Sequence, residues 1–309
     1  MTSKKNSTTT STVFFGTGDV SLATLQGIHA ELDIEAVITK PDLLTSSGHK
    51  KPPAVKVWAE QHSIPCYQPA NKAELSQLLR DIKFSSAVGL VVDYGIIIPP
   101  DVLAAFPNGL VNSHFSLLPK WRGADPITWP ILAGDKETGV TIMQVDEGMD
   151  TGDILYQEAI EIAEQETTAS LTDKLIKLSN RMITESLPAF VAGELAPTAQ
   201  DNDQASYSTK ITKEMGAIDS ELSAAEIERQ IRAFQDWPGS YLTIQGTLLT
   251  IKSAKVSQAK VAPGQLTYQG GQLLFGCTQD SLEILQIQPA GKKPMDAKSF
   301  ANGYARLLA

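Results

Sequence analysis

The sequence predicts an α/β protein, with a Rossmann-like, mostly parallel sheet in its first two thirds and a smaller, OB-like β-barrel in its last third. Short apolar runs alternate with segments of helical spacing up to residue 193, as in sheets built from strand–helix–strand units. After residue 216 the pattern changes to short alternating stretches between glycine-containing turns, which is typical of antiparallel barrels. At 309 residues the chain is long enough for two such domains.

The elements of the first domain follow from the hydrophobic pattern. Residues 12–15 form a strand that runs into a glycine turn and then a helix with apolar residues at 20, 22, 25 and 28. The later elements expected are strands at 34–38, 86–92, 109–112 and 139–145 and helices near 55–62, 72–81 and 168–193. The run at 86–92 is apolar almost throughout, which predicts a central strand covered on both faces.

A polar stretch separates the two domains. Residues 194–216 lack periodicity, so we expect a linker there, with the boundary between residues 203 and 204. Beyond it, Ser223 and Glu226 resemble a capping box that opens a helix. Strands are then expected at 241–244, 248–253, 272–275 and 282–287. Residues 1–11 are rich in Ser and Thr and predict a disordered tail, so the domains expected are 12–203 and 204–309.

Composition excludes several classes of protein. No apolar run approaches the roughly 18 residues that span a bilayer, and no secretory leader is recognisable, so we expect a cytoplasmic protein without a membrane partner. Cys66 and Cys277 are too few and too far apart for a disulfide framework or a zinc site. The net charge of -9 opposes polyanion binding, but residues 206–309 carry 11 basic and 9 acidic side chains, a net of +2.

One histidine lies among other groups that suit chemistry. Of the four histidines, His114 lies in a dense cluster of polar and turn-forming residues at 112–123. Asn112 and His114 are two apart at the carboxyl end of a predicted strand, so their side chains share one face, where open parallel sheets bind ligands. On position alone, an ordinary pair of polar residues at a strand end fits equally well.

A group of carboxylates follows the next predicted strand. Asp146, Glu147, Asp150 and Asp153 lie within eight residues, in a loop with two glycines. One carboxylate beside His114 would stabilise the imidazolium and favour proton transfer near neutral pH. Calcium is the rival ligand for such a loop, but the alternating Asp/Asn ladder and the distal Glu of a calcium loop are missing. We therefore expect no metal.

Five motifs, in this order, together resemble the folate-dependent formyltransferases. They are Asn-x-His at 112–114, Ser-Leu-Leu-Pro at 116–119, Trp-Arg-Gly-Ala at 121–124, Glu-Thr-Gly-Val-Thr-Ile-Met at 137–143 and Asp-Thr-Gly-Asp at 150–153. Segments at 231–234, 237–238, 288–293 and 300–304 are similar to the C-terminal domain of the methionyl-tRNA formyltransferase branch of that family. The resemblance spans nearly the whole chain.

The resemblance implies a formyl transfer from 10-formyltetrahydrofolate, as co-substrate, to the α-amine of methionine esterified to initiator tRNA. Asn112, His114 and Asp150 match the family's catalytic residues. When the amine attacks the formyl carbon, the Asn112 amide or a protonated His114 binds the oxygen that becomes anionic, and losing such a donor costs about 3 kcal/mol or more. The residues that match the folate pocket are Val92, Tyr94, Gly95, Ser116, Leu117, Leu118 and Pro119.

The predicted tRNA contacts are lysines. Residues 40–56 match a long, usually arginine-rich loop that the family uses against the acceptor stem, yet this chain has no arginine there. Lys50 and Lys51 remain, and lysine neutralises phosphate but lacks the planar fork that reads bases. Lys292 and Lys293 are the predicted contacts on the second domain, supported there by Lys252, Lys255 and Lys298. We expect the protein to act as a monomer.

Other functions stay open. Gly16-Thr17-Gly18 resembles the start of a dinucleotide fingerprint, although Ser21 occupies the third glycine position. A formyltransferase for another amine, such as an amino sugar nucleotide or glycinamide ribonucleotide, would carry the same three catalytic residues. A ribonucleotide enzyme, however, has no need of a further domain of about 100 residues, whereas tRNA profits from one. A tRNA-binding module with a decayed site predicts missing catalytic groups, and here all three are present.

Overall fold

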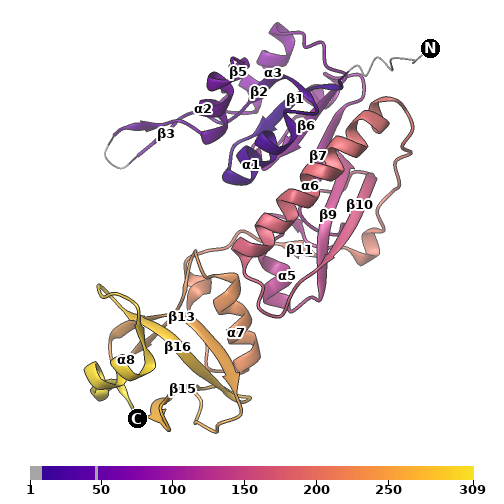
Figure 1. The fold of residues 1–309 in the computed structure, drawn as a ribbon. Coiled ribbons are helices and arrows are strands. Elements are labelled where there is room, and N and C mark those ends of the chain that lie inside the picture. The colour runs from indigo at the N-terminus through magenta and orange to yellow at the C-terminus, as the bar shows by residue number, and fades with distance from the viewer. Residues whose placement is uncertain (1–8, 46–47) are drawn as a thin grey trace, which may run out of the picture. The chain divides into compact units, whose positions relative to one another are not determined.

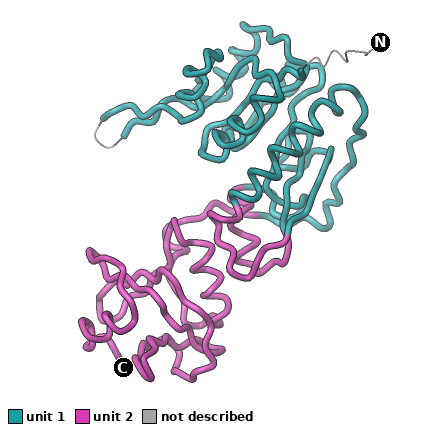
Figure 2. Tube along the Cα trace, viewed as in Figure 1, with its two compact units in different colours: residues 1–123, 138–160, 172–207 teal, residues 124–137, 161–171, 208–309 magenta. Residues whose placement is uncertain are grey.

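The computed structural model describes residues 9–45 and 48–309 (Figure 1). Its chain divides into two compact units (Figure 2). The first unit takes the chain up to residue 123, with 138–160 and 172–207, and the second takes 124–137, 161–171 and 208–309. The chain passes from the first unit to the second for the last time between residues 207 and 208, four residues beyond the predicted boundary. A single linker does not account for the two earlier segments of the second unit.

The first unit is built on a seven-stranded sheet in the order β10-β9-β7-β6-β1-β2-β5. The strands are β1 (Ser11–Gly16), β2 (Asp33–Ile38), β5 (Cys66–Tyr67), β6 (Val88–Val92), β7 (Leu110–His114), β9 (Glu137–Gln144) and β10 (Ile154–Glu161). Strands β5, β2, β1, β6 and β7 run parallel, and β9 is antiparallel to β7. The predicted mostly parallel sheet is therefore confirmed.

Two details at the margins of this sheet differ from the prediction. Strand β1 begins at Ser11, inside the stretch predicted as a disordered tail: Ser11 pairs with Asp33 of β2, and its hydroxyl lies 3.0 Å from that of Ser86. Residues 1–8 of that tail lie outside the described residues. The edge strand β10 was not predicted, since its exposed positions carry polar side chains such as Gln157 and Glu161.

Helices cover both faces of the sheet (Figure 1). They are α1 (Asp19–Ile28), α2 (Ala54–Gln61), α3 (Lys72–Asp81), the short α4 (Pro100–Leu103) and the long α6 (Thr168–Val191). Every residue of β6 is buried, as predicted for a strand covered on both sides. On one face Val13 and Phe15 of β1 pack with Leu75 of α3 and Phe106. In the described residues no helix has the length and apolar composition needed to cross a membrane.

The second unit contains an antiparallel sheet with the predicted helix beside it. The sheet has the order β12-β13-β16-β15-β14, with β17 paired to β16. Its strands are β12 (Ser240–Ile244), β13 (Thr247–Ser257), β14 (Leu266–Gln269), β15 (Gln272–Gly276), β16 (Ser281–Pro289) and β17 (Met295–Asp296). Helix α7 (Ala224–Ala233) opens on the predicted capping box of Ser223 and Glu226, and α5 (Thr128–Ala133) and α8 (Ala297–Gly303) complete the unit. Within the described residues no pairing joins β12 to β14.

Three segments predicted as loops contain short strands. Strands β3 (Leu43–Leu44) and β4 (Lys50–Lys51) pair with each other. Strand β8 (Arg122–Gly123) pairs with β11 (Tyr207–Ser208). The second of these pairs joins the motif loop after His114 to the stretch predicted as a linker, so that stretch is part of the first unit's structure up to residue 207.

Close approach of β9 and β10 makes Gly139 a sensitive position. A Cβ built there would lie 2.0 Å from the Glu158 carbonyl oxygen, a backbone atom that cannot swing away. We expect Gly139→Ala to lower the free energy of unfolding by about 1–3 kcal/mol, measured by urea denaturation. Gly303→Ala is the matched control, because nothing lies within 4 Å of its added methyl group. Equal losses in the two variants would contradict the close approach.

Candidate active site

Strand β7 brings Asn112 and His114 to one face of the sheet at its carboxyl end. In the register of the sheet Asn112 lies beside Val91 and Met143, and His114 beside Thr141. The intervening Ser113 points the other way, and its hydroxyl lies 2.8 Å from that of Ser179 in α6. The two-residue period of a strand therefore aims the amide and the imidazole at the same space.

The His114 ring is held by two partners. Its side chain is only 6% exposed, and its Nε2 lies 2.9 Å from the carbonyl oxygen of Trp121. Because a carbonyl can only accept, Nε2 carries a hydrogen and donates it. The other nitrogen, Nδ1, lies 3.7 Å from Oδ1 of Asp150. This leaves Nδ1 as the nitrogen that can exchange a proton, with a carboxylate beside it to stabilise the charged ring.

Backbone geometry holds Asp150 in this position. Its Oδ2 accepts a 2.8 Å hydrogen bond from the Gly123 amide, while its own φ of 55° lies in the left-handed region. Asp146 is engaged elsewhere in the loop, since it accepts from the Gly148 amide at 3.0 Å and the Thr151 hydroxyl at 2.8 Å. Of the predicted acidic cluster, Asp150 is thus the carboxylate paired with His114, and Asp146 shapes the loop.

The Asn112 amide is available to a ligand. The residue is half-buried, and its side chain makes no hydrogen bond with another residue that the structure describes. An amide NH₂ that is fixed on a strand and not engaged by the protein is a preorganised donor for an oxygen that gains negative charge. Together with the His114 ring, it can bind a carbonyl group during attack by a nucleophile.

The loop after His114 is shaped by its own hydrogen bonds. Ser116 is fully buried and donates to the Lys120 carbonyl at 2.6 Å. The Leu118 amide donates to the Thr141 hydroxyl at 3.1 Å, and its carbonyl accepts from Gln157 at 2.9 Å. The carbonyl groups of Leu117 and Pro119 accept from the amides of Lys120 and Ser206. These hydrogen bonds therefore hold residues 116–119 in one conformation. The contact of these residues with folate stays a prediction.

The other predicted folate residues follow β6. Val92 and Tyr94 are buried, whereas Gly95 is exposed and has a φ of 72°, which glycine adopts readily. The Tyr94 ring packs edge-on against Phe15 with centroids 5.6 Å apart, and its hydroxyl is buried without a partner in the described chain. Burial raises the pKa of the Tyr94 hydroxyl above its ordinary value, so it stays protonated at neutral pH.

The glycine turn after β1 serves packing. A Cβ on Gly18, the N-cap residue of α1, would lie 2.0 Å from Oδ2 of Asp93. The Thr17 amide also donates to the Asp93 carbonyl at 3.2 Å. A carboxylate thus approaches the start of α1, where a dinucleotide's pyrophosphate would have to bind. This geometry opposes the dinucleotide interpretation of residues 16–18.

The predicted tRNA-binding lysines are exposed. Lys50 and Lys51 form β4, whose partner strand exposes Leu43 and Leu44 to 69% and 72%. Lys292 and Lys293 lie in the turn that follows β16. Exposed ammonium groups at such positions are accessible to phosphate, and their binding of tRNA stays a prediction.

The two cysteine thiols are not activated as nucleophiles. Cys66 and Cys277 are both free thiols. Burial raises the pKa of each thiol to about 11, so neither forms a thiolate nucleophile at neutral pH. Over residues 9–45 and 48–309, no group of three or more His, Cys, Asp or Glu side chains is arranged to hold a metal ion.

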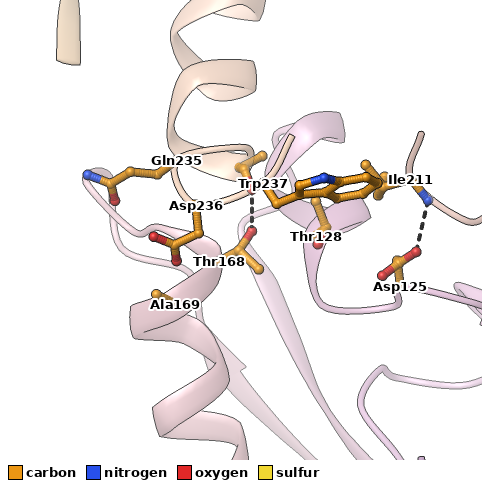
Figure 3. Close-up of a pocket in the computed structure, with 9 residues that line it drawn as sticks. Asp125, Thr128, Thr168, Ala169, Ile211, Gln235, Asp236 and Trp237 are labelled. Carbon is orange, nitrogen blue, oxygen red and sulfur yellow. Dashed lines mark hydrogen bonds between the residues drawn. The ribbon is translucent and has the colours of Figure 1, made fainter. Parts of the chain in front are cut away.

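A separate cavity of about 230 Å³ lies within the second unit (Figure 3). The Trp237 side chain, 57% exposed, lies along it, and Thr168 donates to the Ala233 carbonyl at 2.7 Å. Asp125 accepts from the Ile211 amide at 2.9 Å. None of the residues predicted as catalytic, folate-binding or tRNA-binding lines this cavity.

The groups that hold His114 and Asp150 were not identified from the sequence. The Trp121 carbonyl and the Gly123 amide are backbone groups, so residue type gives no signal for them. The Gln200 side chain contacts the carbonyl groups of Asp150 and Gly152 and lies in the stretch predicted as a linker. A polar residue in a stretch without periodicity gives no indication of whether it faces water or a neighbouring loop.

Comparison with known proteins identifies the family. Residues 12–187 match the formyl transferase family, and residues 210–305 match the formyl transferase C-terminal domain. The chain is 39% identical to a methionyl-tRNA formyltransferase of Methylococcus capsulatus, over 95% of this chain and 96% of that protein. The corresponding figures for a Myxococcus xanthus methionyl-tRNA formyltransferase are 38%, 94% and 94%.

A solved structure has the same fold. The crystal structure of an N-formyltransferase from Helicobacter canadensis, in complex with folinic acid and dTDP-3-aminofucose, has a TM-score of 0.66 at 20% identity. The match covers 89% of this chain and 98% of that one. With both domains matched and near-full-length relatives at this level of identity, the chain belongs to the formyl transferase family.

Proposed function

We propose that the protein transfers the formyl group of 10-formyltetrahydrofolate to the α-amine of methionine esterified to initiator tRNA. The observation that carries this proposal is the 39% identity with a methionyl-tRNA formyltransferase over 95% of the chain. Folinic acid in the Helicobacter canadensis enzyme of the same fold supports a formyl-folate donor. In this proposal residues 12–203 carry the chemistry and 204–309 help to bind tRNA, in a cytoplasmic monomer.

The site geometry suits this reaction. The amine nitrogen bonds to the formyl carbon, whose oxygen becomes anionic and accepts from the Asn112 amide. The amine then loses a proton, and the bond from the formyl carbon to the folate nitrogen breaks as that nitrogen is protonated. His114 Nδ1 transfers the proton, because Nε2 is engaged with Trp121 and Asp150 stabilises the imidazolium formed in between. The protein itself forms no covalent bond to the formyl group.

The lysines of the second unit provide a separate test of tRNA binding. The doubly substituted variant Lys292→Ala and Lys293→Ala should bind tRNA more weakly. The slope of the logarithm of its binding constant against the logarithm of salt concentration should be shallower by about one unit for each lost phosphate contact. Its KM for the folate donor should not change. The experiment is a salt titration of initiator tRNA binding, with Lys260→Ala as control because Lys260 pairs with Asp280 at 3.2 Å. An unchanged slope would contradict phosphate contact at these lysines.

An amino sugar nucleotide is the second candidate acceptor. It is favoured by the fold shared with the Helicobacter canadensis enzyme, whose structure contains dTDP-3-aminofucose. The two candidates are distinguished by offering 10-formyltetrahydrofolate with initiator methionyl-tRNA, free methionine or an amino sugar nucleotide in parallel. We expect methionyl-tRNA to be formylated with a kcat/KM far above those of the other two. Preferential formylation of the sugar would overturn the proposed acceptor.

A further inference from the structure

The segment that follows α6 reaches the catalytic loops. Gln200 Nε2 donates to the Asp150 carbonyl at 2.9 Å and to the Gly152 carbonyl at 2.7 Å. These bonds hold the Asp150–Thr151 and Gly152–Asp153 peptide groups, next to the point where Asp150 has a left-handed backbone. A residue 50 positions away in sequence therefore controls the backbone that carries the carboxylate beside His114.

The other end of the same amide joins the loop after His114. Gln200 Oε1 accepts from Arg122, from Nε at 3.1 Å and from Nη2 at 2.7 Å. Arg122 is 2% exposed and Gln200 is half-buried, so these bonds are partly shielded from water. The next residue, Gly123, donates its amide to the Asp150 carboxylate at 2.8 Å.

These contacts close a ring around the catalytic carboxylate. The ring runs from Gln200 to the Asp150 backbone, through its side chain to Gly123, and back through Arg122 to Gln200. An amide is suited to this place because it donates two hydrogens from one end and accepts at the other. A carboxylate would keep the bonds from Arg122 but present oxygen to the two carbonyl groups.

Ser206, in the same segment, bonds to the loop of Trp121, whose carbonyl group is the other partner of His114. Its hydroxyl accepts from the Trp121 amide at 3.0 Å, and its carbonyl accepts from the Arg122 amide at 2.9 Å. Trp121, whose carbonyl receives the His114 Nε2 hydrogen, has a φ of 61° in the left-handed region. Gln200 and Ser206 thus contact both loops that orient the imidazole.

We propose that Gln200 is a positioning residue for formyl transfer, which sets the place of the Asp150 carboxylate against His114 Nδ1 through its bonds to the Asp150 and Gly152 carbonyl groups. This inference rests on the proposed function, and it adds a role for a residue that does not touch the reactants. Its effect is on the geometry of the reacting pair, for which a displacement of about 1 Å can cost 10²-fold in rate.

The test compares two substitutions at Gln200 with a glutamine of the same segment. Gln200→Leu removes donors and acceptor, and Gln200→Glu keeps the acceptor for Arg122 but loses both donors to the carbonyl groups. Both variants should lower kcat for formyl transfer by about 10- to 100-fold and change KM for either substrate by less than about threefold. The control is Gln204→Leu, since Gln204 is exposed and, among the residues that the structure describes, its side-chain amide bonds only Asp201, at 2.8 Å.

A role limited to folding gives different results. If Gln200 served only to satisfy the buried Arg122, Gln200→Glu would restore wild-type kcat, which would overturn the proposal. A double-mutant cycle with Asp150→Asn adds a second readout. Because Gln200 is proposed to act through Asp150, the doubly substituted enzyme should be about as slow as Asp150→Asn alone, and multiplied losses would overturn the proposal.

Each measurement is expressed relative to the wild-type enzyme. The wild-type rate with methionyl-tRNA reports on the proposed function by itself, and the ratio of variant to wild type with whichever acceptor is used reports on Gln200. Circular dichroism and thermal unfolding accompany each variant. If Gln200→Leu does not fold, Gln200→Glu, which keeps the pairing with Arg122, decides the result.

Discussion

Replacing His114 by alanine should reduce the rate of formyl transfer by about 10²- to 10⁴-fold, the range lost with a group that transfers a proton in the transition state. The substitution removes the ring nitrogen that lies 3.7 Å from Asp150 and the hydrogen bond to the Trp121 carbonyl. The loss should appear in kcat, measured at saturating concentrations of both substrates, with little change in the affinity for the folate donor.

A histidine away from the site provides the control. His62 is exposed and stacks on Trp58 at a centroid distance of 4.0 Å, so His62→Ala removes an imidazole without touching the catalytic face. We expect its kcat to equal that of the wild-type enzyme. A His114→Ala enzyme with more than about a tenth of the wild-type kcat would contradict a role in proton transfer.

Replacing Asn112 by aspartate should cost about 10²- to 10³-fold in kcat, the loss that follows removal of a donor to an oxyanion. The exchange nearly keeps the shape of the side chain, but it replaces an NH₂ group by a carboxylate oxygen that repels the developing negative charge. Because the amide makes no hydrogen bond within the described chain, the fold should tolerate the change. Single-turnover kinetics separates this loss from any change in substrate binding.

The matched exchange for this prediction is Asn302→Asp on helix α8. Asn302 is exposed, and the substitution adds the same charge in the second unit. Wild-type kcat in Asn302→Asp together with a large loss in Asn112→Asp is the expected pair of results. Nearly wild-type turnover in Asn112→Asp would instead show that the oxyanion is stabilised elsewhere.

The strands whose buried residues form a continuous apolar run in the sequence could be predicted. Strand β6 is apolar at every position because helices cover both faces, and the period of two correctly placed Asn112 and His114 on one face. Strand β10 was missed because its outer face is polar, and the pair β3 and β4 because two-residue strands have no period.

The interactions that orient His114 and Asp150 could not be predicted from the sequence. Residues 194–216 looked like a linker because they are polar, yet Gln200, Asn202 and Ser206 bond to the loop of Arg122. Polarity in a segment has the same appearance whether the side chains face water or buried partners. The Trp121 carbonyl and the Gly123 amide exist at every residue type, so only the folded backbone shows what they hold.

The central claim, that the face formed by Asn112 and His114 formylates methionine on initiator tRNA, is tested most directly with a donor labelled in its formyl carbon. The enzyme is incubated with ¹³C-labelled 10-formyltetrahydrofolate and initiator methionyl-tRNA, and the aminoacyl ester is hydrolysed for mass analysis. We predict labelled formylmethionine with the wild-type enzyme and only a trace with His114→Ala. Unlabelled methionine from both enzymes, in the presence of intact folded protein and donor, would contradict the claim.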